Sequence, residues 1–331
     1  MKLKAGKLSP DFLTELLKNL TDPGDKSIIL GPGIGFDSAV IDIGDLYLVI
    51  SSDPITFVTE DIGFYTLAVN VNDIVVTGAV PRYLVLTLLL PEGKTEKKDV
   101  KRIFEEIKKI SKKLGISIIG GHTEVTVGID HAITSGTILG FVEKEKLVRQ
   151  DGAQPGDAVI MTKFAGVEGT SIIAREKNLS DYFSPHEIDQ MRNFHVDPGI
   201  LILDDVKCLK SMVKPTSMHD PTEGGVAQAL YEVATASRVG MLIFKERIPV
   251  HPYTKKLASI FSFDPLGLIS SGSLIATVPV DYVDRILKNC HDFNVSVIGE
   301  VKEAGFGIKM LDGNKLVNLP QFPQDEITRI L

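Results

Sequence analysis

The chain has 331 residues, of which 44% are hydrophobic and 24% are charged, and its formal net charge at pH 7 is −7. One hydrophobic core rarely serves so long a chain, so two domains are expected. The excess of acidic residues and the lack of a long basic run disfavour nucleic-acid binding. The longest apolar runs, such as residues 83–90, are too short to cross a bilayer, so no membrane association is expected.

The chain contains two cysteines, Cys208 and Cys290, which lie far apart in the sequence. Without close spacing they favour two reduced thiols over a zinc site or a disulfide framework. Residues 1–12 lack the apolar segment of a signal peptide. Together these features predict a cytoplasmic protein.

The first half of the chain predicts a mixture of helices and strands. A short helix is expected after Ser9-Pro10, because serine caps helices and proline suits the first helical position. Two strand-like runs that meet at Gly44-Asp45 predict a hairpin. The apolar spacing then predicts, in chain order, a helix over residues 64–79, a strand over 82–90, an amphipathic helix over 99–114, and strands over 116–119 and 132–142.

Turn-forming residues cluster at residues 151–157, and the domain boundary is placed there, giving domains 1–150 and 151–331. The second part is expected to hold a strand over 158–162, a helix that opens at residues 219–225, and a hairpin that turns at Asp312-Gly313. Helices and strands are mixed without strict alternation. The predicted fold class is therefore α+β rather than a doubly wound sheet.

Four polar clusters lie where an apolar element ends or is interrupted. They are Asp37 after a glycine-rich loop, Asp53 before a proline, Asn72-Asp73 within an apolar helix, and His122-Thr123-Glu124 after an apolar run. The glycine-rich loop carries aspartates but no lysine or arginine, whereas a loop that holds phosphate directly usually carries a lysine. Carboxylates instead favour a magnesium ion, which takes oxygen ligands and bridges to phosphates.

Each cluster also has a purely structural interpretation. Asp37 and Asp53 can start or cap turns, and a lone histidine such as His122 is more often structural than a ligand. Asn72-Asp73 is harder to explain in this way. A carboxylate among apolar helix residues is costly unless it is paired, bound to a metal or turned to water. The combination of clusters, rather than any one residue, indicates a magnesium–phosphate site.

Residues 219–225, with the sequence HDPTEGG, open a predicted helix. Asp220 or Thr222 can cap it, and Gly224-Gly225 would expose backbone N–H groups at a helix start, where anions such as phosphate bind. An ordinary capped helix is the alternative. Glu223 and Glu232 flank this turn and are candidates for a general base. The chain contains no Walker A loop, Rossmann fingerprint or hydrolase motif.

Eight stretches resemble the superfamily of ATP-binding proteins related to aminoimidazole-ribonucleotide (AIR) synthetase. They occur in family order over almost the whole chain: GPGIGFDSAV, SSDPI, VNDIVVTGAVP, IIGGHTEV, PGDAVIMT, HDPTEGG, SGSLIATVP and VIGEV. The superfamily includes thiamine-monophosphate kinase, selenophosphate synthetase and the hydrogenase-maturation factor HypE. The pair HDPTEGG and SGSLIATVP is most similar to HypE and its relatives.

The resemblance implies a PurM-like fold, in which the N-terminal domains of a homodimer share a β-barrel and a C-terminal α+β domain packs beside it. It also implies ATP in the cleft, with Mg²⁺ bridging the phosphates to Asp37, Asp53 and Asp73. The residues expected to contact the cofactor are Gly33, Gly35, Asp37, Asp53, Asn72, Thr123, Asp220, Gly224 and Gly225. The candidates for catalysis are Asp73, His122 and Glu223.

The expected function is that of an ATP-dependent enzyme that activates a small carboxamide or transfers a phosphoryl group to a small acceptor. HypE dehydrates a carbamoyl group carried on a C-terminal cysteine, whereas this sequence has Leu331 in that place. Phe36 also stands where relatives often carry an acidic residue. The alternatives are therefore HypE-type carbamoyl dehydration by another route, with a maturation-factor partner, and a catalytically idle ATP-binding protein.

Overall fold

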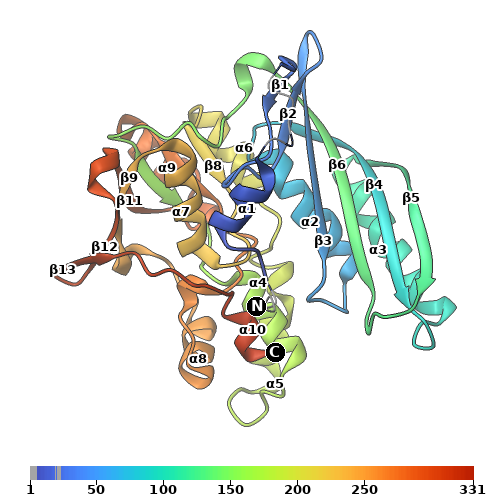
Figure 1. Ribbon diagram of the computed structural model, residues 1–331. Helices are drawn as coiled ribbons and strands as arrows, with labels where there is room; N and C mark the ends of the chain where they lie inside the picture. The colour runs from blue at the N-terminus through green and yellow to red at the C-terminus, as the bar shows by residue number, and fades with distance from the viewer. Residues whose placement is uncertain (1–5, 19, 21–23) are drawn as a thin grey trace. The chain divides into compact units, whose positions relative to one another are not determined.

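The computed structural model describes residues 6–18, 20 and 24–331 (Figure 1). The chain divides into two compact units. A small unit comprises residues 26–31 and 37–147. A large unit comprises the described residues up to Asp25, the loop Pro32–Phe36, and Val148–Leu331. None of the helices in the described part of the chain combines the length and the apolar character that crossing a bilayer requires.

The small unit is built on one six-stranded sheet with the order β1-β2-β3-β6-β4-β5. Neighbouring strands are antiparallel except for the parallel pair β4 and β5. The hairpin predicted at Gly44-Asp45 is confirmed as the turn between β2 and β3. The elements are β1 Ile28–Leu30, β2 Ala39–Asp42, β3 Leu46–Ile55, α2 Ile62–Val75, β4 Val80–Pro91, α3 Lys97–Leu114, β5 Ser117–Thr126 and β6 Ile133–Glu143.

The two helices of the small unit differ in how much of their surface they bury. Helix α2 packs on β3 and β6, and it is buried almost all round, as its near-continuous apolar sequence predicts. Helix α3 packs against α2 (Figure 1) through one face that includes Ile103 and Ile107. Its lysines are exposed. Gly115 ends α3 in a left-handed conformation. Any polar side chain on α2 must therefore be satisfied inside the protein.

The large unit is built on a seven-stranded sheet with the order β13-β12-β9-β11-β7-β10-β8. The hairpin predicted at Asp312-Gly313 is confirmed as the turn between β12 and β13. The strands are β7 Ala158–Met161, β8 Ser217–His219, β9 Gly240–Phe244, β10 Ile275–Val278, β11 Ser296–Lys302, β12 Ile308–Asp312 and β13 Lys315–Asn318. The helices are α1 Pro10–Leu17, α4 Val167–Glu176, α5 Pro185–Arg192, α6 Leu203–Met212, α7 Gly225–Ser237, α8 Pro252–Phe261, α9 Val283–Asn289 and α10 Ile327–Ile330.

The two faces of the large sheet carry different helices. Helix α7 packs on one face, where Val159 and Met161 of β7 join Met241 and Ile243 of β9 in the main core. Side chains alternate along a strand, so Ile160 points to the opposite face. There it lies with side chains of α6 and α9. The mixed sheets of both units confirm the predicted α+β fold class.

The expectation of two reduced cysteines is wrong. Cys208 of α6 and Cys290, the residue after α9, form a disulfide with their Cα atoms 6.0 Å apart. The two residues are 82 positions apart in the sequence, and only the packing of α6 against α9 brings them together. Spacing along the chain could not reveal this pair, because short-range cysteine patterns report only local sites.

Reducing this disulfide should lower the stability of the large unit. Cross-linking residues this far apart removes chain entropy from the unfolded state, and such a bond typically contributes about 2–4 kcal/mol. We expect dithiothreitol to shift the urea unfolding midpoint of the wild-type protein downward. The Cys208→Ser/Cys290→Ser variant should unfold at the lower midpoint with or without reductant. Equal midpoints for all four samples would contradict the bond.

Candidate functional site

The carboxylate of Asp73 is the centre of a buried network in the small unit. Asp73 lies on α2 and is 3% exposed. Its Oδ2 atom accepts a hydrogen bond of 2.5 Å from the hydroxyl of Ser51 on β3. Its backbone carbonyl accepts one of 2.7 Å from the hydroxyl of Ser38. These bonds connect α2 to β3 and to the segment that leads into β2.

Asp53 and Asp37 are the other two predicted metal ligands. The same network holds the elements that carry them close to Asp73. Asp53 lies two residues after Ser51 on β3, so both side chains point to the same face of the strand. Asp37 directly precedes Ser38 in the chain. Among the described residues, however, the three carboxylates do not place ligand atoms all within 4.8 Å of one another. Their donor set consists of oxygens only, which fits a hard cation such as Mg²⁺.

Asn70 fixes the backbone at Asp53, and sequence reasoning missed this residue. Its Oδ1 atom accepts the N–H of Asp53 at 3.1 Å, and its Nδ2 atom donates to the Asp53 carbonyl at 3.3 Å. A Cβ atom on Gly136 would lie 2.8 Å from the Asn70 amide, so the neighbouring strand needs glycine there. Asn70 precedes Asp73 by one helical turn, and that spacing is the signal that could have revealed it.

His122 and Thr123 lie within the edge strand β5, not after it as the sequence suggested. His122 is 65% exposed, and its Nε2 atom lies 3.0 Å from Oε2 of Glu124, which is also exposed. The sheet order places β6 and β4 between β3 and β5. Within the small unit, the His122-Thr123 pair is therefore not brought together with the aspartates.

Close packing explains why the glycine-rich loop needs its glycines. Gly35 has a positive φ of 80°, and a Cβ atom there would lie 2.6 Å from the carbonyl oxygen of Glu232 on α7. A Cβ atom on Gly33 would lie 2.7 Å from the ring of Phe36. The loop thus needs glycine in order to lie against α7, whether or not it also approaches a phosphate.

The glycine turn at the start of α7 already holds an anion, which the chain itself supplies. The N–H of Gly224 donates to Oδ2 of Asp325 at 2.6 Å, and Asp325 is buried. The other oxygen, Oδ1, accepts from the N–H groups of Ile269 and Ile327. A Cβ atom on Gly225 would clash with two backbone carbonyl oxygens. A phosphate on the Gly224 amide would have to displace the Asp325 carboxylate, a residue that no motif singled out.

Glu168 is a second buried carboxyl group of the large unit that the sequence did not single out. Its Oε2 atom has no hydrogen-bond partner in the part of the chain that the structure describes, while the carboxyl group is hydrogen-bonded to Ser271. Burial raises the pKa of Glu168 to about 7, although the hydrogen bonds with Ser271 act to lower it. Burial likewise raises the pKa of Asp325 to about 6. Both groups therefore exchange protons near neutral pH.

Glu232 and Glu223, the two candidates for a general base, are both engaged in contacts. The Oε2 atom of Glu232, on α7, lies 2.7 Å from Nε2 of His219, and the side chains of this pair are 12% and 3% exposed. Burial acts to raise the pKa of Glu232, but the charge of Lys7 and the hydrogen bond with His219 outweigh it and lower the pKa to about 2. Glu232 is thus ionised and positions His219. Glu223 accepts the backbone N–H of Lys7 at 3.0 Å.

Comparison with known proteins places this arrangement in a family. Residues 35–142 match the N-terminal domain of AIR synthase related proteins, and residues 154–310 match the C-terminal domain. The chain belongs to the AIR synthase related protein family. The resemblance drawn from the eight sequence stretches is therefore confirmed, and so is the two-domain PurM-like fold.

The relatives of this AIR synthase related protein include hydrogenase-maturation proteins. A hydrogenase expression/formation protein of Methanocaldococcus jannaschii is 30% identical, over 93% of each chain. The carbamoyl dehydratase HypE of Rhizobium leguminosarum bv. viciae is 31% identical over 72% of this chain and 66% of its own length. A crystal structure of the maturation protein HypE in complex with ATP has a TM-score of 0.69 at 24% identity, over 89% of this chain and 90% of that one.

Replacing Glu168 by glutamine should remove a pH dependence of stability. The folded pKa of about 7 lies above the ordinary value of 4.5, so the folded state binds more protons than the unfolded state between these values. The wild-type protein should therefore lose stability, on the order of 3 kcal/mol in total, as the pH rises from about 4.5 to above 7. Glutamine mimics the protonated form, so Glu168→Gln should be markedly more stable than wild type at pH 8 but not at pH 5.

Urea unfolding at the two pH values measures this effect. Glu176→Gln changes an exposed glutamate at the end of the same helix and is the matched control. A pH dependence of Glu168→Gln equal to that of the control would show that Glu168 does not hold a proton in the folded state.

Proposed function

We propose that this protein binds ATP together with Mg²⁺, and that it uses ATP either to activate a small carboxamide or to phosphorylate a small acceptor. The observation that carries the proposal is the Asp73 network, which joins the elements bearing Asp37, Asp53 and Asp73 inside one unit. Two further findings support it: membership of the AIR synthase related family, and the fold shared with a HypE structure that contains ATP.

In this proposal the aspartates hold the metal ion, which when bound neutralises the charge of the phosphates. Asp37 and Asp53 are partly exposed, whereas Asp73 is buried and also braces β3 through Ser51. Asn70 keeps the Asp53 backbone in position. The proposed nucleotide contacts are Gly33, Gly35, Asn72, Thr123, Asp220, Gly224 and Gly225, and the proposed catalytic groups are Asp73, His122 and Glu223.

A second candidate function is the carbamoyl dehydration performed by HypE. Its support is the 31% identity to a carbamoyl dehydratase over 72% of this chain. Both cysteines of this sequence lie in the disulfide between α6 and α9, so neither offers a thiol while that bond is intact. HypE-type chemistry on this chain would therefore require an acceptor thiol from reduction of the bond or from a maturation-factor partner.

The edge strand β5 supports the proposed homodimer. Ser117–Val125 of this strand are all exposed, with Ile119 and Val125 among them. A long edge strand with exposed apolar residues and unpaired backbone groups is a site for pairing with another strand. We propose that β5 of a second copy covers it.

Asp53→Asn should weaken binding of Mg²⁺-ATP at least tenfold and abolish ATP turnover, because the variant removes one of the proposed metal-binding charges. Calorimetric titration of ATP with and without Mg²⁺, followed by a phosphate-release assay, measures both effects. Asp45→Asn, in the exposed turn before the same strand, should change neither. Unaltered binding of Mg²⁺-ATP by Asp53→Asn would contradict the proposal. If the wild-type protein binds ATP tightly but does not turn it over, a catalytically idle nucleotide-binding protein is favoured instead.

Ile119→Lys/Val125→Lys should convert a dimer into a monomer, because charges on a strand edge oppose pairing. Light scattering after size exclusion gives the mass. Ile43→Lys changes an equally exposed isoleucine in the β2–β3 turn and should leave the mass unchanged. A monomeric wild-type protein at high concentration would refute the dimer.

A further inference from the structure

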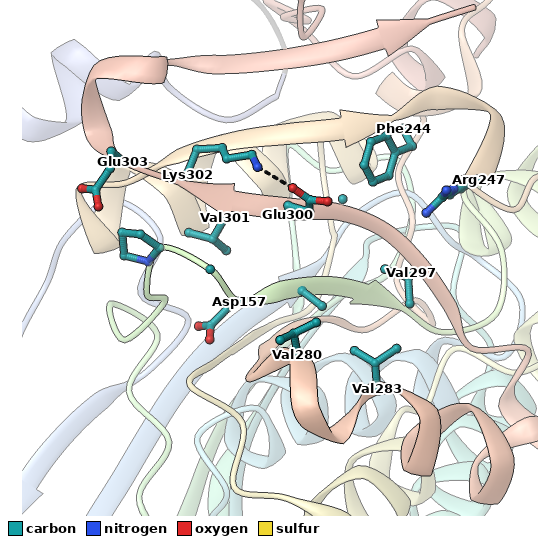
Figure 2. A pocket seen from close by; sticks show the side chains of 14 residues that line it. Asp157, Phe244, Arg247, Val280, Val283, Val297, Glu300, Val301, Lys302 and Glu303 are labelled. Carbon is teal, nitrogen blue, oxygen red and sulfur yellow. Dashed lines mark hydrogen bonds and ion pairs between the residues drawn. The ribbon is translucent and has the colours of Figure 1, made fainter.

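A cavity of about 500 Å³ lies on the large sheet (Figure 2). It is lined by residues of β7, β9 and β11, by the turn that precedes β7, by the short helical turn 245–247 after β9, and by residues 280–283, which lead into α9. Its size is within the range of small-molecule sites. Ala158 and Phe244 line it, whereas their strand neighbours Val159 and Ile243 belong to the core under α7. Because side chains alternate, the cavity opens on the sheet face opposite α7. It is therefore distinct from the glycine turn that begins α7.

The middle of the cavity is apolar. Figure 2 shows Val280, in the short turn before α9, and Val283, the first residue of α9, facing Val297 of β11 across the hollow. Val280 is 63% exposed, which is unusual for a branched apolar side chain at the wall of a concave surface. An apolar group placed here would remove this surface from water.

One end of the cavity presents a guanidinium group with unused hydrogen-bond donors. The carbon at the centre of the Arg247 guanidinium lies 4.4 Å from the centroid of the Phe244 ring. Stacking on an aromatic ring orients the planar fork of donors that arginine offers to a carboxylate. The guanidinium of Arg247 forms no hydrogen bond or ion pair with any other described residue. The neighbouring Lys245, by contrast, is paired with Asp312.

The other charges around the cavity limit the ligand to one negative charge. Lys302 is paired with Glu300, as the dashed line in Figure 2 shows. Asp157 accepts hydrogen bonds from the N–H of Gln154 and the hydroxyl of Thr216. Glu303 is exposed and lies at the end away from Arg247 (Figure 2). A second anionic group at that end would be repelled.

We propose that this cavity binds a small amphipathic monocarboxylate. The carboxylate accepts hydrogen bonds from the Arg247 guanidinium, and the aliphatic or aromatic body lies on Phe244 and the three valines. A dicarboxylate of similar length is disfavoured, because its second charge approaches Glu303. The proposal does not depend on the nucleotide site, since every lining residue belongs to the large unit and none is among the proposed ATP ligands.

Hexanoate, hexylamine and adipate are suitable probes, because they share a six-carbon chain and differ in charge. Ligand-observed NMR with the full-length protein, without nucleotide, gives the affinity of each. We expect hexanoate to bind with a dissociation constant on the order of millimolar, as for a ligand with few heavy atoms. Adipate should bind more weakly and hexylamine not at all. Equal binding of hexanoate and hexylamine, or no binding of either, would overturn the proposal.

Arg247→Gln should weaken hexanoate binding about tenfold or more, because a charge-assisted hydrogen bond is lost. Lys245→Gln removes the same charge from the same short turn outside the cavity and should have no effect. Phe244→Leu, which removes the ring under the guanidinium, should weaken binding to an intermediate degree. Similar losses in Arg247→Gln and Lys245→Gln would show a general effect of surface charge and reject the site.

Discussion

A carboxylate buried in the middle of an apolar helix is the constraint on which the small unit depends. Removing a charge from water costs several kcal/mol unless hydrogen bonds or an opposite charge compensate it. Helix α2 is buried almost all round, so Asp73 cannot turn to solvent. The Ser51 hydroxyl, supplied by β3, meets part of this need. The apolar surface of α2 packs the helix on the sheet, and the bonds of Asp73 to Ser51 and Ser38 then fix the segments that carry the other aspartates.

The carboxylates of the large unit show how the environment decides the role of the same chemical group. Asp325 stabilises the start of α7 from 101 residues away, through backbone N–H groups. Glu168 holds Ser271 and keeps its proton near neutral pH because it is buried. Glu232 is also largely removed from water, yet it stays ionised because Lys7 and His219 supply positive charge and a hydrogen bond. Counting acidic residues in a motif cannot separate these roles, since each depends on partners from distant segments.

The seven-stranded sheet has two faces with different consequences. The face under α7 is closed by the main core, and glycines such as Gly225 and Gly35 allow backbone segments to approach that helix closely. On the opposite face, α6 and α9 are joined by the disulfide and cover Ile160, while the start of α9 leaves a hollow beside β11. The same alternation of side chains that builds the core therefore also creates a second concave surface.

The sequence by itself determined the local elements and the family. The helix expected over residues 64–79, which the structure has as α2 Ile62–Val75, follows from apolar periodicity, and so does the amphipathic helix that ends at Gly115. The hairpins at Gly44-Asp45 and Asp312-Gly313 follow from turn chemistry, which acts over a few residues. The eight stretches sufficed to identify the family because they occur in family order over almost the whole chain.

Only the tertiary structure decided which distant side chains meet. The Cys208–Cys290 bond, the Asp325 carboxylate on Gly224 and the support of Asp53 by Asn70 all join residues from different elements. Helical spacing could mark Asn70 as lying beside Asp73, but no local pattern encodes which distant partner a side chain meets, because such contacts form only when separate elements pack against one another.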